Sequence, residues 1–145
     1  MELEIRKNIG NPSSYNYRGL IYVEENRYAE AVADFSDALV HQGPDPDLLV
    51  RRGWAYYKNG DDERAISDYD AALRLRVDFP LAHVNRAQAL WHKGNLEEAE
   101  RDLDEIIAKH PLDASTYKDR AKLRKAKGDL GGAADDLIKA KQLQH

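Results

Sequence analysis

The sequence contains no cysteine, which excludes disulfides, thiolate metal sites and a cysteine nucleophile. It also lacks any apolar run near the roughly 20 residues that a membrane span needs, so we expect no membrane insertion. Its first residues, Met1 to Ile5, show neither the basic start nor the apolar stretch of a signal peptide. A cytoplasmic location is therefore the default expectation.

The usual signatures of catalysis are missing as well. The sequence has no glycine-rich phosphate loop and no nucleophile elbow. Its five histidines are scattered without the spacing of metal ligands: His41, His83, His92, His110 and His145. We therefore expect a protein that is not an enzyme and that needs neither a cofactor nor a metal ion.

What the sequence does contain is an internal repeat with a period of 34 residues. Hydrophobic residues make up 42% and charged residues 33% of the 145 residues, as expected for a folded, amphipathic chain. One column of the repeat holds Ala31, Ala65, Ala99 and Ala133, and another holds Phe35, Tyr69, Leu103 and Leu137. No insertion or deletion interrupts this register, so chance is a poor explanation for it.

Each unit of the repeat has the pattern of two amphipathic helices joined by a tight turn. In the second unit, Asp45 and Pro46 supply an N-cap and a first-turn proline, and Gly60 ends the helix. The expected helices cover residues 13–25, 28–41, 47–59, 62–76, 81–93, 96–108, 115–127 and 130–143. The sequence thus predicts an all-α chain of about eight helices.

These columns resemble the tetratricopeptide repeat (TPR), whose signature places small, aromatic and alanine residues over 34 positions. The first unit matches through Tyr15, Gly19, Tyr22, Ala31, Phe35 and Ala38, whereas the fourth unit departs from the pattern at Arg124, where the family has an aromatic residue. The resemblance covers residues 12–145. It implies a right-handed α-α superhelix, a helical-hairpin solenoid whose members bind very diverse protein partners.

The resemblance also implies an organisation for the chain. The four repeats are expected at residues 12–45, 46–79, 80–113 and 114–145. The preceding residues 1–11 form a lead-in that resembles the end of a second helix of this family. No polar capping helix follows the last repeat, so Leu130, Leu137, Ile138 and Leu143 are expected to be partly exposed.

A charge pair recurs in every unit. Arginine stands where the family usually has leucine, at Arg18, Arg52, Arg86 and Arg120. Sixteen residues later the chain has Asp34, Asp68, Asp102 and Asp136. Since this interval joins the middles of two antiparallel helices, we expect structural ion pairs within each hairpin, because charges in a packed interface need partners. The alternative is four arginines lining a ligand groove.

The family binds partners in a concave groove formed by the first helix of each repeat. The corresponding residues here are Asn16, Leu20, Val23, Val50, Arg51, Trp54, Tyr57, Val84, Asn85, Gln88, Trp91, Lys118 and Lys122. Trp54, Tyr57 and Trp91 lie outside the core columns of the family. They are therefore either binding anchors or packing residues between adjacent first helices.

One sub-class of the family grips the C-terminal carboxylate of chaperones with a clamp of lysine, asparagine and arginine residues. The clamp positions in the first three repeats hold Asn16, Leu20, Arg51, Leu81 and Asn85. A shift by one repeat gives Val50, Trp54, Asn85, Ser115 and Asp119. Neither set reproduces the clamp, so we expect no chaperone binding of this type.

Charge is unevenly distributed along the chain. Residues 12–45 carry two basic and six acidic residues, whereas residues 114–145 carry eight basic and four acidic ones. Three functional hypotheses follow. The first is a scaffold for protein–protein interaction that binds a peptide or protein segment in the groove. The second is a self-assembling module, a homo-oligomer formed through the C-terminal hairpin. The third, RNA binding through a basic fourth repeat, is disfavoured by the acidic first three repeats.

Overall fold

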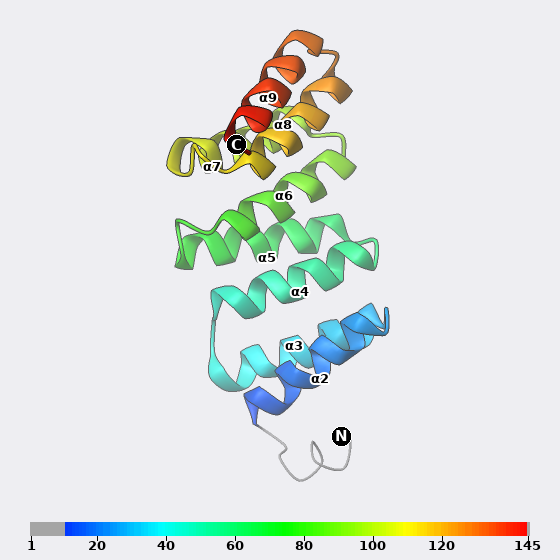
Figure 1. Ribbon diagram of the computed structural model, residues 1–145. Coiled ribbons are helices and arrows are strands. Elements are labelled where there is room, and N and C mark those ends of the chain that lie inside the picture. Colours follow the sequence, from blue (N-terminus) through cyan, green and yellow to red (C-terminus); the bar gives the residue numbers. More distant parts are fainter. Residues whose placement is uncertain (1–10, 145) are drawn as a thin grey trace. The chain divides into compact units, whose positions relative to one another are not determined.

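The computed structural model describes residues 11–144, which form eight α-helices and no strand within that range (Figure 1). The all-α prediction is therefore confirmed. The helices are α2 (Pro12–Glu24), α3 (Tyr28–Gln42), α4 (Pro46–Lys58), α5 (Asp62–Leu75), α6 (Pro80–His92), α7 (Leu96–Lys109), α8 (Ala114–Lys127) and α9 (Leu130–Leu143). Each begins and ends within one residue of its predicted bounds. The expected lead-in at residues 1–11 lies, except for Asn11, outside the described residues.

Helix starts are fixed by capping residues and by proline. α2 and α4 begin one residue earlier than expected, because Pro12 and Pro46 are their first helical residues. The side chains of Asn11 and Asp45 cap these helices by accepting hydrogen bonds from backbone N–H groups. Within each hairpin the intervening turn contains a residue with positive φ. These residues are Asn26 (φ 60°), Gly60 (φ 87°), Gly94 (φ 90°) and Gly128 (φ 87°).

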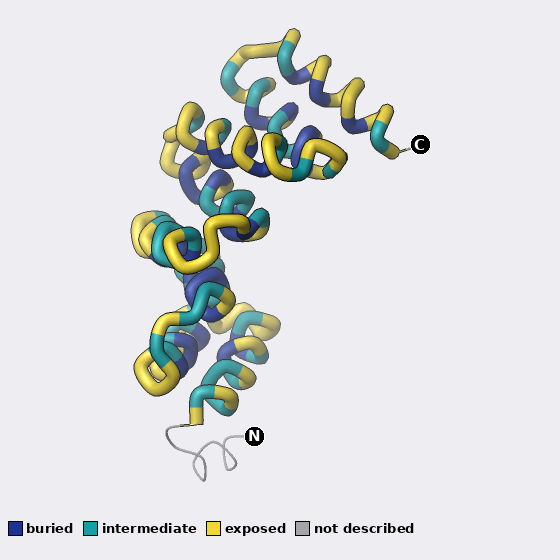
Figure 2. The backbone as a smooth tube through the Cα atoms, turned by 90° about the vertical axis from the view of Figure 1, so that its left-hand side faces the viewer, coloured by how far each residue is buried: buried dark blue, intermediate teal, exposed yellow. Residues whose placement is uncertain are grey.

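The chain divides into two compact units, one ending at Ala82 and the other beginning at His83. In the first unit, apolar residues from α2, α3 and α4 form one buried cluster: Tyr22, Ala31, Phe35, Ala38, Leu48 and Ala55. In the second unit the buried residues of α7, α8 and α9 include Leu103, Ile106, Leu123 and Ala140. Buried and exposed segments alternate along each helix, as amphipathic packing requires (Figure 2).

Residue volume in one helix of a hairpin is matched to volume in the other. A Cβ atom on Gly19 would lie 2.5 Å from Cε1 of Phe35, and one on Gly53 would lie 2.6 Å from Cε1 of Tyr69. Both contacts are too close, so each aromatic ring requires a glycine opposite it. In the second unit alanine (Ala87 and Ala121) occupies the glycine column, and leucine replaces the aromatic residue.

Candidate functional site

Each hairpin contains an arginine that contacts the aspartate sixteen residues later. Arg18 donates from Nε and Nη2 to the two carboxylate oxygens of Asp34, both at 2.7 Å. The same two-bond geometry joins Arg52 to Asp68, at 2.8 and 2.7 Å, and Arg120 to Asp136, at 3.0 and 2.7 Å. The carboxylates are nearly inaccessible, with side chains 4–7% exposed. This geometry supports a structural role for the arginines.

Hydrogen bonding to a carboxylate keeps these guanidinium groups charged. Asp68 raises the pKa of Arg52 above its ordinary value, against the opposing effect of burial. Asp136 likewise raises the pKa of Arg120, and Asp104 adds to the shift. Burial raises the pKa of the Asp68 carboxyl, and the hydrogen bond from Arg52 opposes that rise.

Arg52 and Arg120 also reach back to the preceding hairpin, a contact that the sequence analysis did not predict. Arg52 Nη1 donates to Oγ of Ser36 at 3.1 Å, and Arg120 Nη1 donates to Asp104 Oδ1 at 2.9 Å. In both cases the acceptor lies sixteen residues before the arginine. The 34-residue register already placed Ser36 and Asp104 in one column, and that signal could have predicted the contact.

The third hairpin adds a histidine to the pair. Arg86 Nη2 lies 2.5 Å from Asp102 Oδ1, and His83 Nδ1 lies 3.1 Å from the same oxygen. His83 stands in a column that is otherwise apolar or aromatic, and its contact with a carboxylate was not expected.

Arg124, where the chain departs from the family pattern, is part of a cluster of charges between α7 and α8. It donates from Nε to Glu100 Oε1 at 2.6 Å and from Nη1 to Asp136 Oδ2 at 3.2 Å. Lys127 Nζ lies 2.9 Å from Glu100 Oε2 and 2.8 Å from Glu97 Oε1. Burial alone would raise the pKa of Glu100, but the hydrogen bonds from Arg124 and Lys127 outweigh it and lower that pKa.

In the first unit, the predicted groove residues of α2 lie in three different environments. Leu20 is exposed. Asn16 is half-buried and accepts a hydrogen bond at 2.9 Å from Nη1 of Arg51, another predicted groove residue. Val23 packs against the apolar cluster of this unit, so part of its surface is used internally.

The predicted groove residues of α4 form an aromatic patch. The rings of Trp54 and Tyr57 are half-buried and lie 5.6 Å apart, tilted by 33°. Lys58 places its ammonium 5.6 Å from the centre of the Trp54 ring. Val50, by contrast, is only 4% exposed and offers almost no surface to a partner. Trp54 thus both packs and remains accessible.

In the second unit, α6 presents Gln88 and Trp91 to solvent, and Trp91 is 36% exposed. Val84 is half-buried and Asn85 is buried, so these two predicted groove residues contribute little accessible surface.

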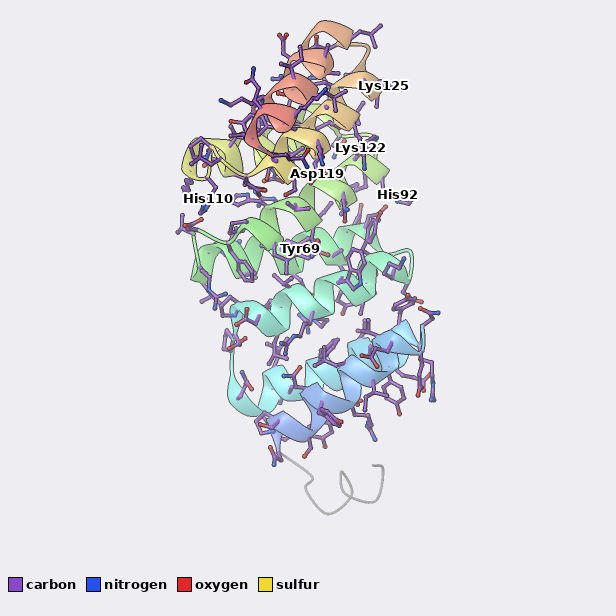
Figure 3. The ribbon with its side chains drawn as sticks, in the orientation of Figure 1. Tyr69, His92, His110, Asp119, Lys122 and Lys125 are labelled. Carbon is purple, nitrogen blue, oxygen red and sulfur yellow. The ribbon has the colours of Figure 1, made fainter. Side chains whose placement is uncertain are left out.

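Basic residues dominate the accessible surface of α8. Lys118, Lys122 and Lys125 are exposed, and Asp119 lies half-buried on the same helix (Figure 3). Burial raises the pKa of the Asp119 carboxyl above its ordinary value. Asp119 makes no hydrogen bond or ion pair with any residue between 11 and 144. Such a carboxylate can accept hydrogen bonds from a ligand.

Two features are absent from the described part of the chain. None of its helices combines the length and the apolar character that crossing a bilayer requires. None of its His, Asp and Glu side chains gather in a group of three or more that could hold a metal ion.

These hairpins of matched small and large residues define a helical-repeat protein. The family model for the tetratricopeptide repeat matches residues 16–76, 50–114 and 84–142. The chain therefore belongs to the tetratricopeptide repeat family. No curated protein sequence matches it.

Several solved structures share this fold at low sequence identity. MamA from Desulfovibrio magneticus RS-1 is 17% identical, with a TM-score of 0.88 over 97% of this chain and 79% of its own. YrrB, described as a TPR protein with an unusual peptide-binding site, is 22% identical, with a TM-score of 0.81 over 97% and 72% of the two chains. The first TPR of Spaghetti (RPAP3), bound to an HSP90 peptide, is also 22% identical, with a TM-score of 0.75 over 81% and 94%.

Proposed function

We propose that the chain is a non-catalytic interaction scaffold that binds an extended peptide segment on the accessible face of the first helices of its repeats. The observation that carries this proposal is the accessibility of both tryptophans, Trp54 and Trp91, which stand outside the core columns of the repeat. Accessible tryptophans are frequent anchors of protein interfaces. Peptide binding by the similar folds of YrrB and Spaghetti supports the same function.

The charges of the two units suggest what such a peptide contains. The aromatic patch of Trp54 and Tyr57 suits an apolar side chain. The exposed lysines of α8 suit acidic side chains, and the Asp119 carboxylate suits a backbone N–H donor. We therefore expect the first unit to bind apolar residues of a partner and the second unit to bind acidic residues.

The HSP90 peptide bound by Spaghetti is not the partner that we expect for this chain. Leu20 and Leu81 stand at two of the clamp positions, and a leucine side chain cannot hydrogen-bond a carboxylate. Arg51, at a third position, donates to Asn16 within the protein.

The test is a peptide-display selection against the full chain, followed by titration of the selected peptides. Trp54→Ala and Trp91→Ala should each weaken binding about 10-fold or more, the usual effect of removing an aromatic anchor. Leu112→Ala is the matched control, because Leu112 is 76% exposed in the loop between α7 and α8. Selected peptides that bind both tryptophan variants as tightly as the unaltered chain would refute the proposal.

A second candidate function, self-association, rests on the exposure of α9. Leu137 is 55% exposed, although Phe35, Tyr69 and Leu103 in the same column are at most 3% exposed. Leu130 and Ile138 are exposed beside it on the same helix, at 66% and 57%. The acidic first repeat complements the basic fourth repeat, which suits a second copy of this chain as the partner.

Sedimentation equilibrium of the full chain over a wide concentration range tests this second function. A concentration-dependent dimer that Leu137→Glu abolishes supports self-association through α9. A monomer at every concentration excludes it.

Nucleic-acid binding has less support than it had from the sequence. That hypothesis depended on five basic side chains of α8, namely Lys118, Lys122, Arg124, Lys125 and Lys127. Arg124 and Lys127 are already paired with Glu100, which reduces the positive charge that phosphates could meet.

A further inference from the structure

The first unit has a pocket that lies apart from the surface proposed above. It has a volume of about 460 Å³ and opens between α3, α4 and α5. Its apolar lining includes Leu39, Val40, Leu49 and Leu75. None of its lining residues belongs to the predicted groove, and most of them come from the second helices of the hairpins, α3 and α5.

The pocket runs from solvent into the core of the unit. Val40 and Leu75 are 79% and 52% exposed at its mouth, whereas Leu49 is only 7% exposed. Ligand sites are commonly apolar hollows of a few hundred Å³ with a small number of polar groups. This volume is ample for one leucine or isoleucine side chain together with the backbone that carries it.

The column of Leu49 holds residues of different size in different repeats. In the fourth repeat that column holds Tyr117, whose larger side chain is buried and donates from its hydroxyl to the carbonyl of Pro111 at 2.9 Å. Leucine has a smaller side chain than tyrosine and fills less space at this position. Because well-packed proteins leave few such volumes, an open apolar one is a reason to consider a ligand.

Two arginines line the pocket, and only one of them is available to a ligand. Arg52 is held by Asp68 and Ser36. Arg74 is exposed, and its guanidinium makes no hydrogen bond or ion pair with any residue that the structure describes. An apolar hollow beside a free guanidinium fits an aliphatic group that has a carboxylate next to it.

We propose that this pocket is a second peptide-binding site, which takes a leucine-sized aliphatic side chain while a neighbouring acidic residue of the same peptide pairs with Arg74. The site accepts a short acidic segment of a partner protein. The pocket therefore adds a contact on the second helices to the peptide-binding surface proposed on the first helices. A partner protein that occupies both surfaces would bind with higher overall affinity than one that occupies either alone.

Amide chemical shifts of the ¹⁵N-labelled full chain test this site directly. The probe is the acetylated and amidated peptide Ser-Glu-Leu-Glu-Ser, titrated to about 10 mM because one short peptide is expected to bind only with a dissociation constant near 1 mM. Saturable shifts are expected at Leu39, Val40, Leu49 and Leu75. The matched peptide Ser-Gln-Leu-Gln-Ser should bind about 5- to 10-fold more weakly, since it lacks the carboxylate for Arg74.

Two variants separate the contributions to this binding. Arg74→Gln should reduce the affinity for the glutamate peptide to that for the glutamine peptide. Leu49→Tyr, which copies the fourth repeat, should fill the pocket and remove binding of both peptides, and its circular dichroism spectrum confirms folding. Arg101→Gln is the matched control, because Arg101 is an exposed arginine of α7 without a partner among the described residues.

The proposal is wrong if no saturable shifts occur at the pocket, or if Arg74→Gln and Arg101→Gln have the same effect. Shifts centred on Trp54 or Trp91 would also contradict it, although they would agree with the proposed function. Conversely, pocket shifts in the Trp54→Ala variant would support this site even if the first-helix surface binds nothing.

Discussion

The two units join successive hairpins with different chemistry. Between α3 and α4 of the first unit, the contact is largely apolar, with Ala38, Leu48 and Ala55 in one buried cluster. Arg52 adds a hydrogen bond to the neutral hydroxyl of Ser36. Between α7 and α8 of the second unit, Arg120, Arg124 and Lys127 form ion pairs with acidic residues of α7. One repeat geometry therefore tolerates either kind of contact.

The ion pair between Arg124 and Glu100 reflects changes in two columns of the repeat. The column of Arg124 holds Tyr22, Tyr56 and Leu90 in the earlier repeats, and the column of Glu100 holds Val32 and Ile66. Both columns change from apolar to charged, with opposite signs. Arg124 also donates to Asp136 and Glu100 also accepts from Lys127, so each of the two charges has more than one partner.

The largest expected loss of stability comes from replacing the paired arginine by alanine, which can be compared between the two units. Arg52→Ala leaves Asp68 buried without a counter-charge and should lower the free energy of unfolding by about 3–5 kcal/mol. Arg120→Ala should cost about 1–2 kcal/mol less, because Arg124 still donates to Asp136. Urea unfolding followed by circular dichroism measures both losses, and hydrogen exchange assigns them to a unit. Equal losses in the two variants would show that Arg124 does not substitute for Arg120.

The next effect tests the matched volumes of the hairpins. Gly53→Ala should destabilise the protein by about 1–3 kcal/mol through overpacking against Tyr69, although alanine is the better helix former. The double variant Gly53→Ala/Tyr69→Leu reproduces the residue types of the second unit. Its loss should be smaller than the sum of the two single losses. Strict additivity in this double-mutant cycle would contradict the matching.

A smaller effect concerns the pH dependence of the ion pairs that Glu100 forms with Arg124 and Lys127. Because the pKa of Glu100 is lowered in the folded state, its stabilisation is present above its unfolded pKa of about 4.3 and is lost as the pH falls through the lower folded value. Glu100→Gln should therefore cost about 1–2 kcal/mol at pH 7 and less at acidic pH. Thermal unfolding from pH 7 to pH 3 measures this. Glu97→Gln, at a side chain 77% exposed, is the control and should have little effect.

The smallest effect concerns Tyr69, whose buried hydroxyl has no hydrogen-bond partner among the described residues (Figure 3). Tyr69→Phe copies the residue of the first repeat and should be neutral or should stabilise the protein by up to about 1 kcal/mol. Thermal unfolding measures it. A clear loss of stability would mean that the hydroxyl is satisfied in solution, for example by water.

Local signals explain why the helices were predictable. Proline recurs at residues 12, 46 and 80, and glycine recurs in the turns at residues 60, 94 and 128, so many of the helix boundaries are marked in the sequence itself. The interval from Arg52 to Asp68 was also readable, because it depends only on the length of two helices and their turn.

Contacts between residues in different columns of the repeat could not be predicted from the 34-residue periodicity. The sequence marked Arg124 only as a departure from the family, since its partner Glu100 lies 24 residues away in another column. Val50 and Asn85 were predicted to line a groove, and the structure shows them only 4% and 8% exposed, a degree of burial that the periodicity of the sequence does not record. The pocket beside Arg74 was missed for a related reason, since an empty volume has no residue to mark it.

The arginines that contact residues sixteen positions before and after them have a consequence for how the number of repeats can increase. Arg52 contacts Ser36 behind it and Asp68 ahead of it, and Arg120 contacts Asp104 and Asp136 at the same intervals. A tandem duplication of any 34-residue stretch of the gene would preserve both intervals, wherever the breakpoints fell. The new hairpin would contain an arginine that pairs with its own aspartate. It would also contain an acceptor for the arginine of the next hairpin. The number of repeats can therefore change by recombination while these hydrogen bonds are kept.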